Sequence, residues 1–105
     1  MDKRKDMMIV KEFKKRLSTR IPLKKIILFG SRVNEKDVKE WSDFDLLIIS
    51  DKFEGIKSFN RSPELYDYWS ENIPVDFLCL TSKEFNNLKK KITIVKEAVN
   101  TGIEI

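Results

Sequence analysis

The sequence predicts an α/β (α+β) fold: a small mixed β-sheet flanked by helices, in one domain over residues 1–105. Three apolar runs have the length of buried strands and end in polar, glycine or proline residues: 24–29, 43–50 and 75–80. Two other segments carry apolar residues at steps of three and four, the spacing of an amphipathic helix: 3–18 and 82–100. A chain of 105 residues has room for one such core.

The first half of the chain is expected to form a helix, a strand and a short helical turn. The helix over 3–18 has ended before Pro22, and the strand over 24–29 runs into Gly30. Ser31 is a good N-cap residue, so we expect it to cap a short helical turn. The polar stretch 34–42 is expected to be a loop before the second strand.

The second half alternates strands and helices. Residues 51–61 look irregular, and Ser62-Pro63-Glu64 predicts the start of a helix over about 63–71. The strand over 75–80 follows. Thr81 is then expected to cap a single long helix over 82–100, and the alternation in 103–105 indicates a short strand.

Composition excludes several kinds of chemistry. The chain has no histidine and a single cysteine, Cys79, so histidine bases, histidine-bound zinc and thiolate clusters are excluded. The lone cysteine and the charged N-terminus predict a cytoplasmic protein with no membrane partner. A net charge of +4 with mixed signs suits an anionic ligand and disfavours a nucleic acid partner.

Three acids stand at the starts of otherwise apolar strands. Asp43 and Asp45 are two residues apart, so in a strand both would project from one face. Taken alone, the pair is explained as well without a metal, with Asp43 as a turn residue and Asp45 as a solvated strand end, as it is by a metal site. Asp76 begins the third strand, and if the two strands are neighbours the three carboxylates converge. Such a cluster predicts Mg²⁺ ligands and a site for two ions.

Gly30 and Ser31 lie at the end of the strand before these acids. Glycine lets the backbone approach a ligand closely, and amides at a helix start bind phosphate oxygens. A Gly-Ser pair alone is usually only a turn. Arg32 and Arg61 are weaker candidates for phosphate binding, since a surface role explains each of them too, and Trp41 is a weak candidate for stacking on a base.

These motifs together resemble a known family. Leu28-Phe29-Gly30-Ser31-Arg32, Ser42-Asp43-Phe44-Asp45-Leu46-Leu47-Ile48 and Val75-Asp76-Phe77 are similar to the minimal nucleotidyltransferases of the DNA polymerase beta superfamily. The resemblance runs from about Lys24 to the final helix. It implies the minimal nucleotidyltransferase fold, ATP as substrate and Mg²⁺ as cofactor.

The resemblance also implies roles and a partner. Gly30 and Ser31 would hold the nucleoside triphosphate, with Arg32 beside them, while Asp43, Asp45 and Asp76 would be the catalytic metal ligands. Family members resemble antitoxins that transfer AMP to a tyrosine of a HEPN-type toxin. This chain departs from the family in having eleven residues, 32–42, between Ser31 and Asp43 where ten are common.

Two alternative functions stay open at this point. The chain could neutralise its partner by occlusion with little turnover, or it could transfer the nucleotide to a small molecule. The sequence also leaves open whether the protein forms a homo-oligomer.

Overall fold

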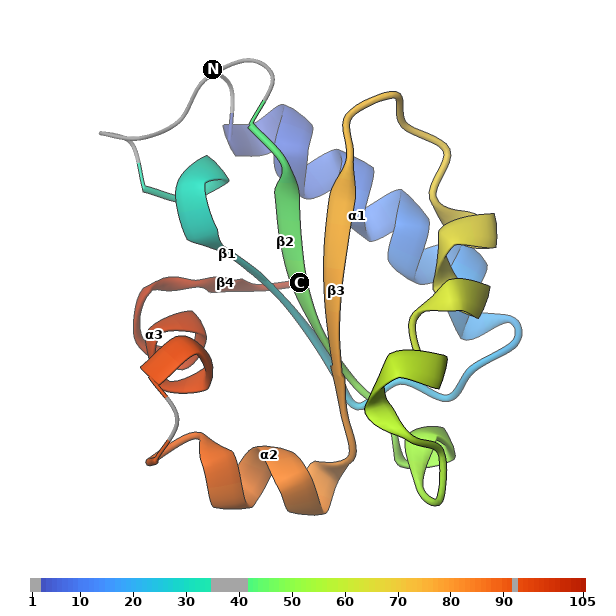
Figure 1. Ribbon diagram of the computed structural model, residues 1–105. Coiled ribbons are helices and arrows are strands. Elements are labelled where there is room, and N and C mark those ends of the chain that lie inside the picture. Colours follow the sequence, from blue (N-terminus) through green and yellow to red (C-terminus); the bar gives the residue numbers. More distant parts are fainter. Residues whose placement is uncertain (1–2, 35–41, 92) are drawn as a thin grey trace.

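The computed structural model describes residues 3–34, 42–91 and 93–105. The described helices are α1 (Lys3–Ser18), α2 (Ser82–Leu88) and α3 (Thr93–Thr101). The described strands are β1 (Lys25–Phe29), β2 (Phe44–Ile49), β3 (Val75–Leu80) and β4 (Ile103–Glu104) (Figure 1). Short 3₁₀ turns connect them at Gly30–Arg32, Asp51–Phe53, Ser58–Asn60 and Pro63–Tyr68.

The four strands form one mixed sheet in the order β3-β2-β1-β4. β1 is antiparallel to both β2 and β4, whereas β2 and β3 are parallel. Parallel neighbours need a crossover connection, and the segment between β2 and β3 supplies it with three of the 3₁₀ turns. The predicted small mixed sheet with flanking helices is confirmed.

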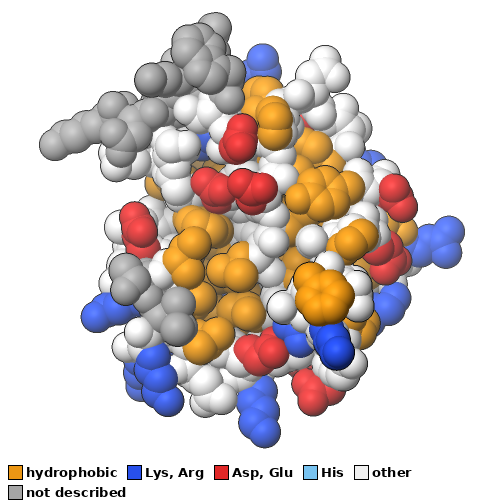
Figure 2. All heavy atoms as spheres, viewed as in Figure 1, with side chains coloured by type: hydrophobic (Ala, Val, Ile, Leu, Met, Phe, Trp, Pro, Cys, Tyr) orange, Lys and Arg blue, Asp and Glu red, His pale blue; other side chains and the backbone are white. Residues whose placement is uncertain are grey.

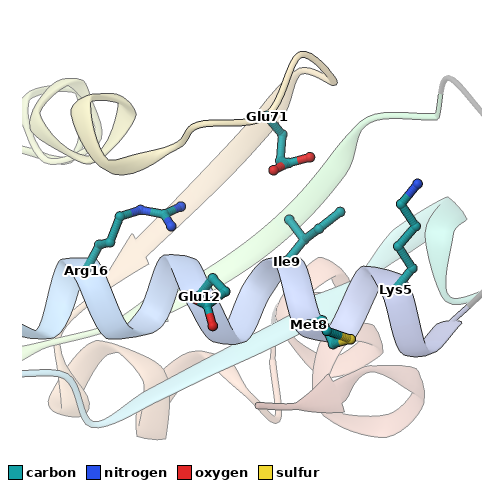
Figure 3. A pocket seen from close by; sticks show the side chains of 6 residues that line it. All are labelled: Lys5, Met8, Ile9, Glu12, Arg16 and Glu71. Carbon is teal, nitrogen blue, oxygen red and sulfur yellow. The ribbon is translucent and has the colours of Figure 1, made fainter.

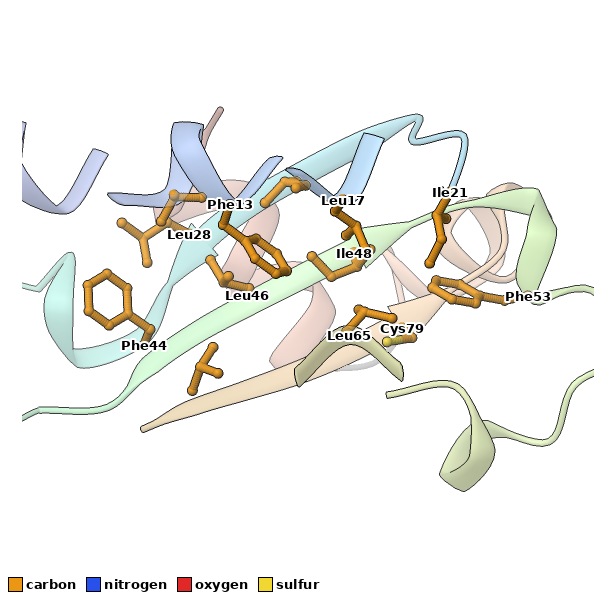
Figure 4. Packing of buried hydrophobic residues seen from close by; sticks show 13 residues of the cluster. Phe13, Leu17, Ile21, Leu28, Phe44, Leu46, Ile48, Phe53, Leu65 and Cys79 are labelled. Atoms are coloured by element: carbon orange, nitrogen blue, oxygen red, sulfur yellow. The ribbon is translucent and has the colours of Figure 1, made fainter. Parts of the chain in front are cut away.

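One face of the sheet is covered by α1 (Figure 4). The helix buries Val10, Phe13 and Leu17 completely, at the three- and four-residue steps that predicted it. The ring of Phe13 lies 5.4 Å from that of Trp69 in an edge-to-face contact and 5.3 Å from that of Phe77. The crossover segment therefore shares this core layer with α1.

The opposite face is covered by α2 and α3. Phe85 of α2 and Ala98 of α3 pack in one apolar cluster with Leu47 and Ile49 of β2. β2 is thus buried on both faces, because its alternate residues Leu46 and Ile48 belong to the α1 layer. Burial on both sides explains why the run 44–49 is apolar throughout apart from Asp45.

The prediction of one helix over 82–100 is wrong, because the structure has two helices there. α2 begins at the predicted cap, where the Thr81 hydroxyl accepts from the Glu84 amide and the Glu84 carboxylate accepts from the Thr81 amide. It ends at Leu88 and α3 begins at Thr93, with the two helices at a steep angle (Figure 1). The break lets both helices press apolar residues against the same sheet face.

The predicted helix over 63–71 is also shorter and tighter than expected. Pro63–Tyr68 is a 3₁₀ helix, and Trp69 already has extended backbone angles. The indole of Trp69 donates to the Ile73 carbonyl at 2.9 Å and is half-buried in the α1 layer, which fixes the chain in its extended course. No described helix is both long enough and apolar enough to cross a membrane.

Candidate active site

Asp45 and Asp76 lie directly opposite each other on neighbouring strands. β2 and β3 are parallel, and their register pairs Asp45 with Asp76. The pairing starts one residue earlier, where the Phe44 amide donates to the Pro74 carbonyl at 3.0 Å. Directly opposed residues on adjacent strands project from the same face at close range. The two acidic strands are therefore neighbours, which is the condition under which the sequence brings their acids together.

The pair lies beyond the part of the sheet that the helices cover. By strand alternation, Asp45 shares its face with Leu47 and Ile49, which lie under α2 and α3 further along the strand. Asp45 is only partly buried, and Asp76 is exposed. Figure 2 shows acidic side chains gathered on the surface over the starts of β2 and β3. The carboxylates are therefore open to a ligand from solvent.

Asp43 stands just before β2 and is exposed. Burial raises the pKa of Asp45 above its ordinary 3.8, and the charges of Asp76 and then Asp43 raise it further. The three acids thus form one electrostatic group. Clustered like charges disfavour ionisation unless a cation compensates them.

Gly30 lies tightly against the Asp45 carboxylate. It follows Phe29, the residue paired with Asp45 across β1 and β2, and its φ is +81°. A methyl group at Gly30 would overlap a carboxylate oxygen of Asp45 and come within 3.1 Å of its carboxyl carbon. Only glycine fits this position without strain. The predicted phosphate turn and the predicted metal ligand are therefore in contact.

Ser31 lies inside the 3₁₀ turn Gly30–Arg32, not at its cap. The structure places Phe29 at the cap position, with no side-chain hydrogen bond there, so the prediction that Ser31 caps the turn is wrong. The turn starts two residues earlier than a cap at Ser31 would place it, because the positive φ of Gly30 redirects the chain at once. The Gly30 carbonyl accepts from the amides of Val33 and Asn34, at 3.1 and 3.2 Å.

Arg32 turns inward rather than toward the acids. Its guanidinium donates to both carboxylate oxygens of Asp6 on α1, and both side chains are almost wholly buried. A third hydrogen bond goes to the Ser42 carbonyl at 2.7 Å. This geometry indicates that Arg32 holds the turn in place, and its predicted contact with a phosphate stays a prediction.

Arg61 also makes its hydrogen bonds away from the acidic group. It pairs with Glu84 through two hydrogen bonds of 2.6 and 3.1 Å and donates to the carbonyls of Ile56 and Cys79. The Arg61 hydrogen bonds hold the pKa of Glu84 down at about 2. Cys79 lies near the end of β3 opposite to Asp76, so Arg61 is not placed at the acidic group. Trp41 lies outside the described residues.

Two surface hollows lie away from the acidic group. One, of about 290 Å³, runs along α1 on the opposite side of the sheet (Figure 3) and is lined by Lys5, Met8, Ile9, Glu12, Arg16 and Glu71. The other, of about 360 Å³, is lined by Lys89, Lys90, Lys96, Val99 and Asn100. Neither contains a predicted site residue.

Cys79 is a buried core thiol, and its burial raises its pKa to about 12.

The acidic group has the donor chemistry that a Mg²⁺ ion needs. Carboxylate oxygens are its preferred protein ligands, usually one or two together with substrate phosphates. Among the described residues, however, no three Asp, Glu or Cys side chains come close enough together to hold one ion. The residues therefore fit an ion held by the opposed Asp45 and Asp76 with help from a bound substrate, and the two-ion site stays a prediction.

Comparison with known proteins gives one family match and a structural match. A family model described as "Nucleotidyltransferase domain" matches residues 10–100 of the chain. Among solved structures, a Sulfolobus solfataricus protein provisionally assigned as a nucleotidyltransferase superposes with a TM-score of 0.65 at 20% identity. The match covers 92% of this chain and 76% of that one. No curated protein is significantly similar in sequence. At this identity the structural likeness shows the fold alone.

Proposed function

Because the chain belongs to the nucleotidyltransferase domain family, we propose that it transfers AMP from ATP to a hydroxyl group of a partner protein. The acceptor in this proposal is a tyrosine of a HEPN-type toxin, and the chain acts as the antitoxin. One observation carries the transfer chemistry of this proposal: Asp45 and Asp76 face each other at the open end of the sheet, with Gly30 against Asp45. The partner and its tyrosine rest on the sequence resemblance.

Each site residue has a role in this proposal. Gly30 and Ser31 hold the triphosphate, because the close approach of the turn to Asp45 brings a bound phosphate beside the carboxylates. Asp45 and Asp76 hold Mg²⁺ together with the substrate phosphates, and Asp43 joins them as the third carboxylate in this proposal. A bound divalent cation neutralises phosphate charge and polarises the phosphorus centre. Burial and then the charges of Asp76 and Asp43 raise the pKa of Asp45, and a cation that compensates these charges stabilises the cluster.

The transfer balances as a single displacement. The acceptor oxygen forms a bond to the α-phosphorus of ATP, the bond from that phosphorus to the bridging oxygen breaks, and pyrophosphate leaves. The proton of the acceptor hydroxyl passes to Asp76, the exposed member of the opposed pair and the one best placed to meet an acceptor from solvent.

The open position of the acids favours a macromolecular acceptor. Both faces of the sheet are covered by the chain's own helices, and Asp43 and Asp76 are exposed at its end. A small acceptor needs a pocket that encloses it, whereas a partner protein brings its own surface. This argument favours a protein over a small molecule such as an aminoglycoside.

The test follows AMP with ATP labelled at the α-phosphate. The chain is incubated with Mg²⁺, labelled ATP and the protein encoded by the adjacent gene. We expect label on a tyrosine of that protein, no label from γ-labelled ATP, and loss of transfer in Asp43→Ala/Asp45→Ala. Asp67→Ala, an exposed acid outside the cluster, is the matched control and keeps the transfer.

One observation supports a second candidate function. Among the described residues no three Asp, Glu or Cys side chains are close enough to hold one ion, and a module that blocks its partner without turnover needs no such group. In that case neither wild type nor Asp43→Ala/Asp45→Ala transfers label, while both bind and silence the partner equally. That result would refute the catalytic proposal.

A further inference from the structure

A buried ion pair joins α1 to the turn beside the acidic group. The Arg32 Nε donates to Asp6 Oδ2 at 3.0 Å, and its Nη2 donates to Asp6 Oδ1 at 2.9 Å. Only 4% and 5% of the two side chains is exposed. Such a two-point contact fixes the orientation of the guanidinium as well as its position.

The same guanidinium reaches the start of β2. Its Nη1 donates to the Ser42 carbonyl at 2.7 Å, and its central carbon lies 4.3 Å from the centre of the Phe44 ring. Ser42 and Phe44 are the two neighbours of Asp43, and Phe44 also precedes Asp45. Arg32 therefore contacts the chain on both sides of one candidate ligand and directly before another.

Stability alone gives a poor account of this pair. Replacing a buried ion pair with apolar residues of similar volume is often neutral or stabilising. The contacts of Arg32 instead link three segments that are distant in sequence: α1, the Gly30–Arg32 turn and the start of β2. Two of these carry candidate site residues, and the third carries none.

We propose that Arg32, oriented by Asp6, is a positioning residue that sets the distance between the Gly30–Ser31 turn and Asp43 and Asp45. The inference rests on the proposed function for its effect on rate, but not for its effect on local structure. It gives α1 a role in the site, through the Asp6 carboxylate that orients the Arg32 guanidinium.

The test removes both charges together, so that neither is left buried alone. In Asp6→Leu/Arg32→Met, we expect a melting temperature within ~8 °C of wild type. We expect kcat for transfer from α-labelled ATP to fall on the order of 10²-fold, since small displacements of reacting groups have effects of that size. The KM for ATP should change much less. Hydrogen exchange at residues 30–33 and 42–45 should quicken roughly tenfold.

The Arg61–Glu84 pair is the matched control. It is also an arginine held by both oxygens of a carboxylate, but it joins the crossover segment to α2. Arg61→Met/Glu84→Leu should alter stability and leave exchange at residues 30–33 and kcat per folded molecule unchanged. Arg32→Lys keeps the charge but loses the two-point contact with the Asp6 carboxylate. This variant should show the same faster exchange, and it serves as the test if the double variant does not fold.

The outcomes separate the two proposals. If hydrogen exchange at residues 30–33 and 42–45 is as slow in the Asp6 and Arg32 variants as in wild type, the positioning role is overturned, whatever the activity. Unchanged kcat with faster exchange also overturns it, because the ordered geometry would then be irrelevant to transfer. If wild type transfers no AMP while exchange quickens as expected, the proposed function fails and the structural link between α1 and the site stands.

Discussion

Gly30 is the residue at which the backbone and the candidate chemistry come closest. It has a φ of +81°, and Gly55 has almost the same value, +79°. The two glycines differ in their surroundings, because a methyl group at Gly55 would meet nothing within 4 Å, whereas at Gly30 it would overlap the Asp45 carboxylate. Replacing each glycine with alanine therefore distinguishes two effects: backbone strain, which both positions share, and displacement of Asp45, which only Gly30 would cause.

We predict that Gly30→Ala abolishes nucleotidyl transfer and Gly55→Ala does not. Both place alanine at a left-handed φ and should each lower the free energy of unfolding by about 1–2 kcal/mol. Gly30→Ala should lower it further, because the Asp45 side chain must also move. Urea unfolding and transfer rates per folded molecule measure the two effects. Equal activity in the two variants would contradict a functional contact between Gly30 and Asp45.

At the scale of elements, the parallel pairing of β2 and β3 brings the acids together at an electrostatic cost. Asp45 has a pKa above its ordinary 3.8, through burial first and then Asp76 and Asp43. The folded protein therefore holds this proton more tightly than the unfolded chain. The resulting stabilisation is fully present below the ordinary pKa and is lost as the pH rises through the raised pKa.

We predict that Asp45→Asn is more stable than wild type at neutral pH without metal. The advantage should shrink as the pH is lowered toward 3.8, because wild-type Asp45 then becomes neutral as well. Added Mg²⁺ should raise the melting temperature of wild type and not that of the variant, since only a binding-competent fold gains from the ligand. Thermal unfolding at several pH values measures both trends. Asp67→Asn, outside the cluster, should show neither.

The strands were more predictable than the short helices for a physical reason. A strand buried on both faces appears in the sequence as a continuous apolar run, so β1, β2 and β3 differ by at most one residue at either end from the predicted runs. Helical spacing continues through 82–100 whether or not the backbone breaks, so the periodicity does not reveal that α2 ends at Leu88.

The acids of the candidate site were easier to predict from the sequence than the residues that hold its turn in place. An acid in an apolar strand is conspicuous, so the sequence alone indicates Asp45 and Asp76 as candidate ligands. The role of Asp6 was missed because it ends a run of charged residues, 2–6, at the start of the chain. It does stand four residues before Val10, and so continues the buried stripe of α1 through Phe13 and Leu17. Its place on that stripe was the available signal.

At the scale of the whole molecule, one sheet separates two apolar clusters. The α1 cluster and the cluster under α2 and α3 are both built on β2, whose residues alternate between them. The acidic group lies at one end of this shared strand, while Lys and Arg side chains gather lower down around α2 and α3 (Figure 2). A strand common to both clusters predicts that neither unfolds without the other.

We therefore predict that the chain unfolds as one cooperative unit, as a single domain should. Phe13→Ala, in the α1 cluster, removes a ring packed against Trp69 and Phe77 and should cost about 3–5 kcal/mol. Because β2 belongs to both clusters, hydrogen-exchange protection of α3 on the far face should fall by the same free energy as that of α1. Leu88→Ala, at the half-buried edge of the other cluster, should lower both by a smaller and again equal amount. Loss of protection confined to α1 in Phe13→Ala would show instead that the two layers unfold separately, and that the single-domain prediction is wrong.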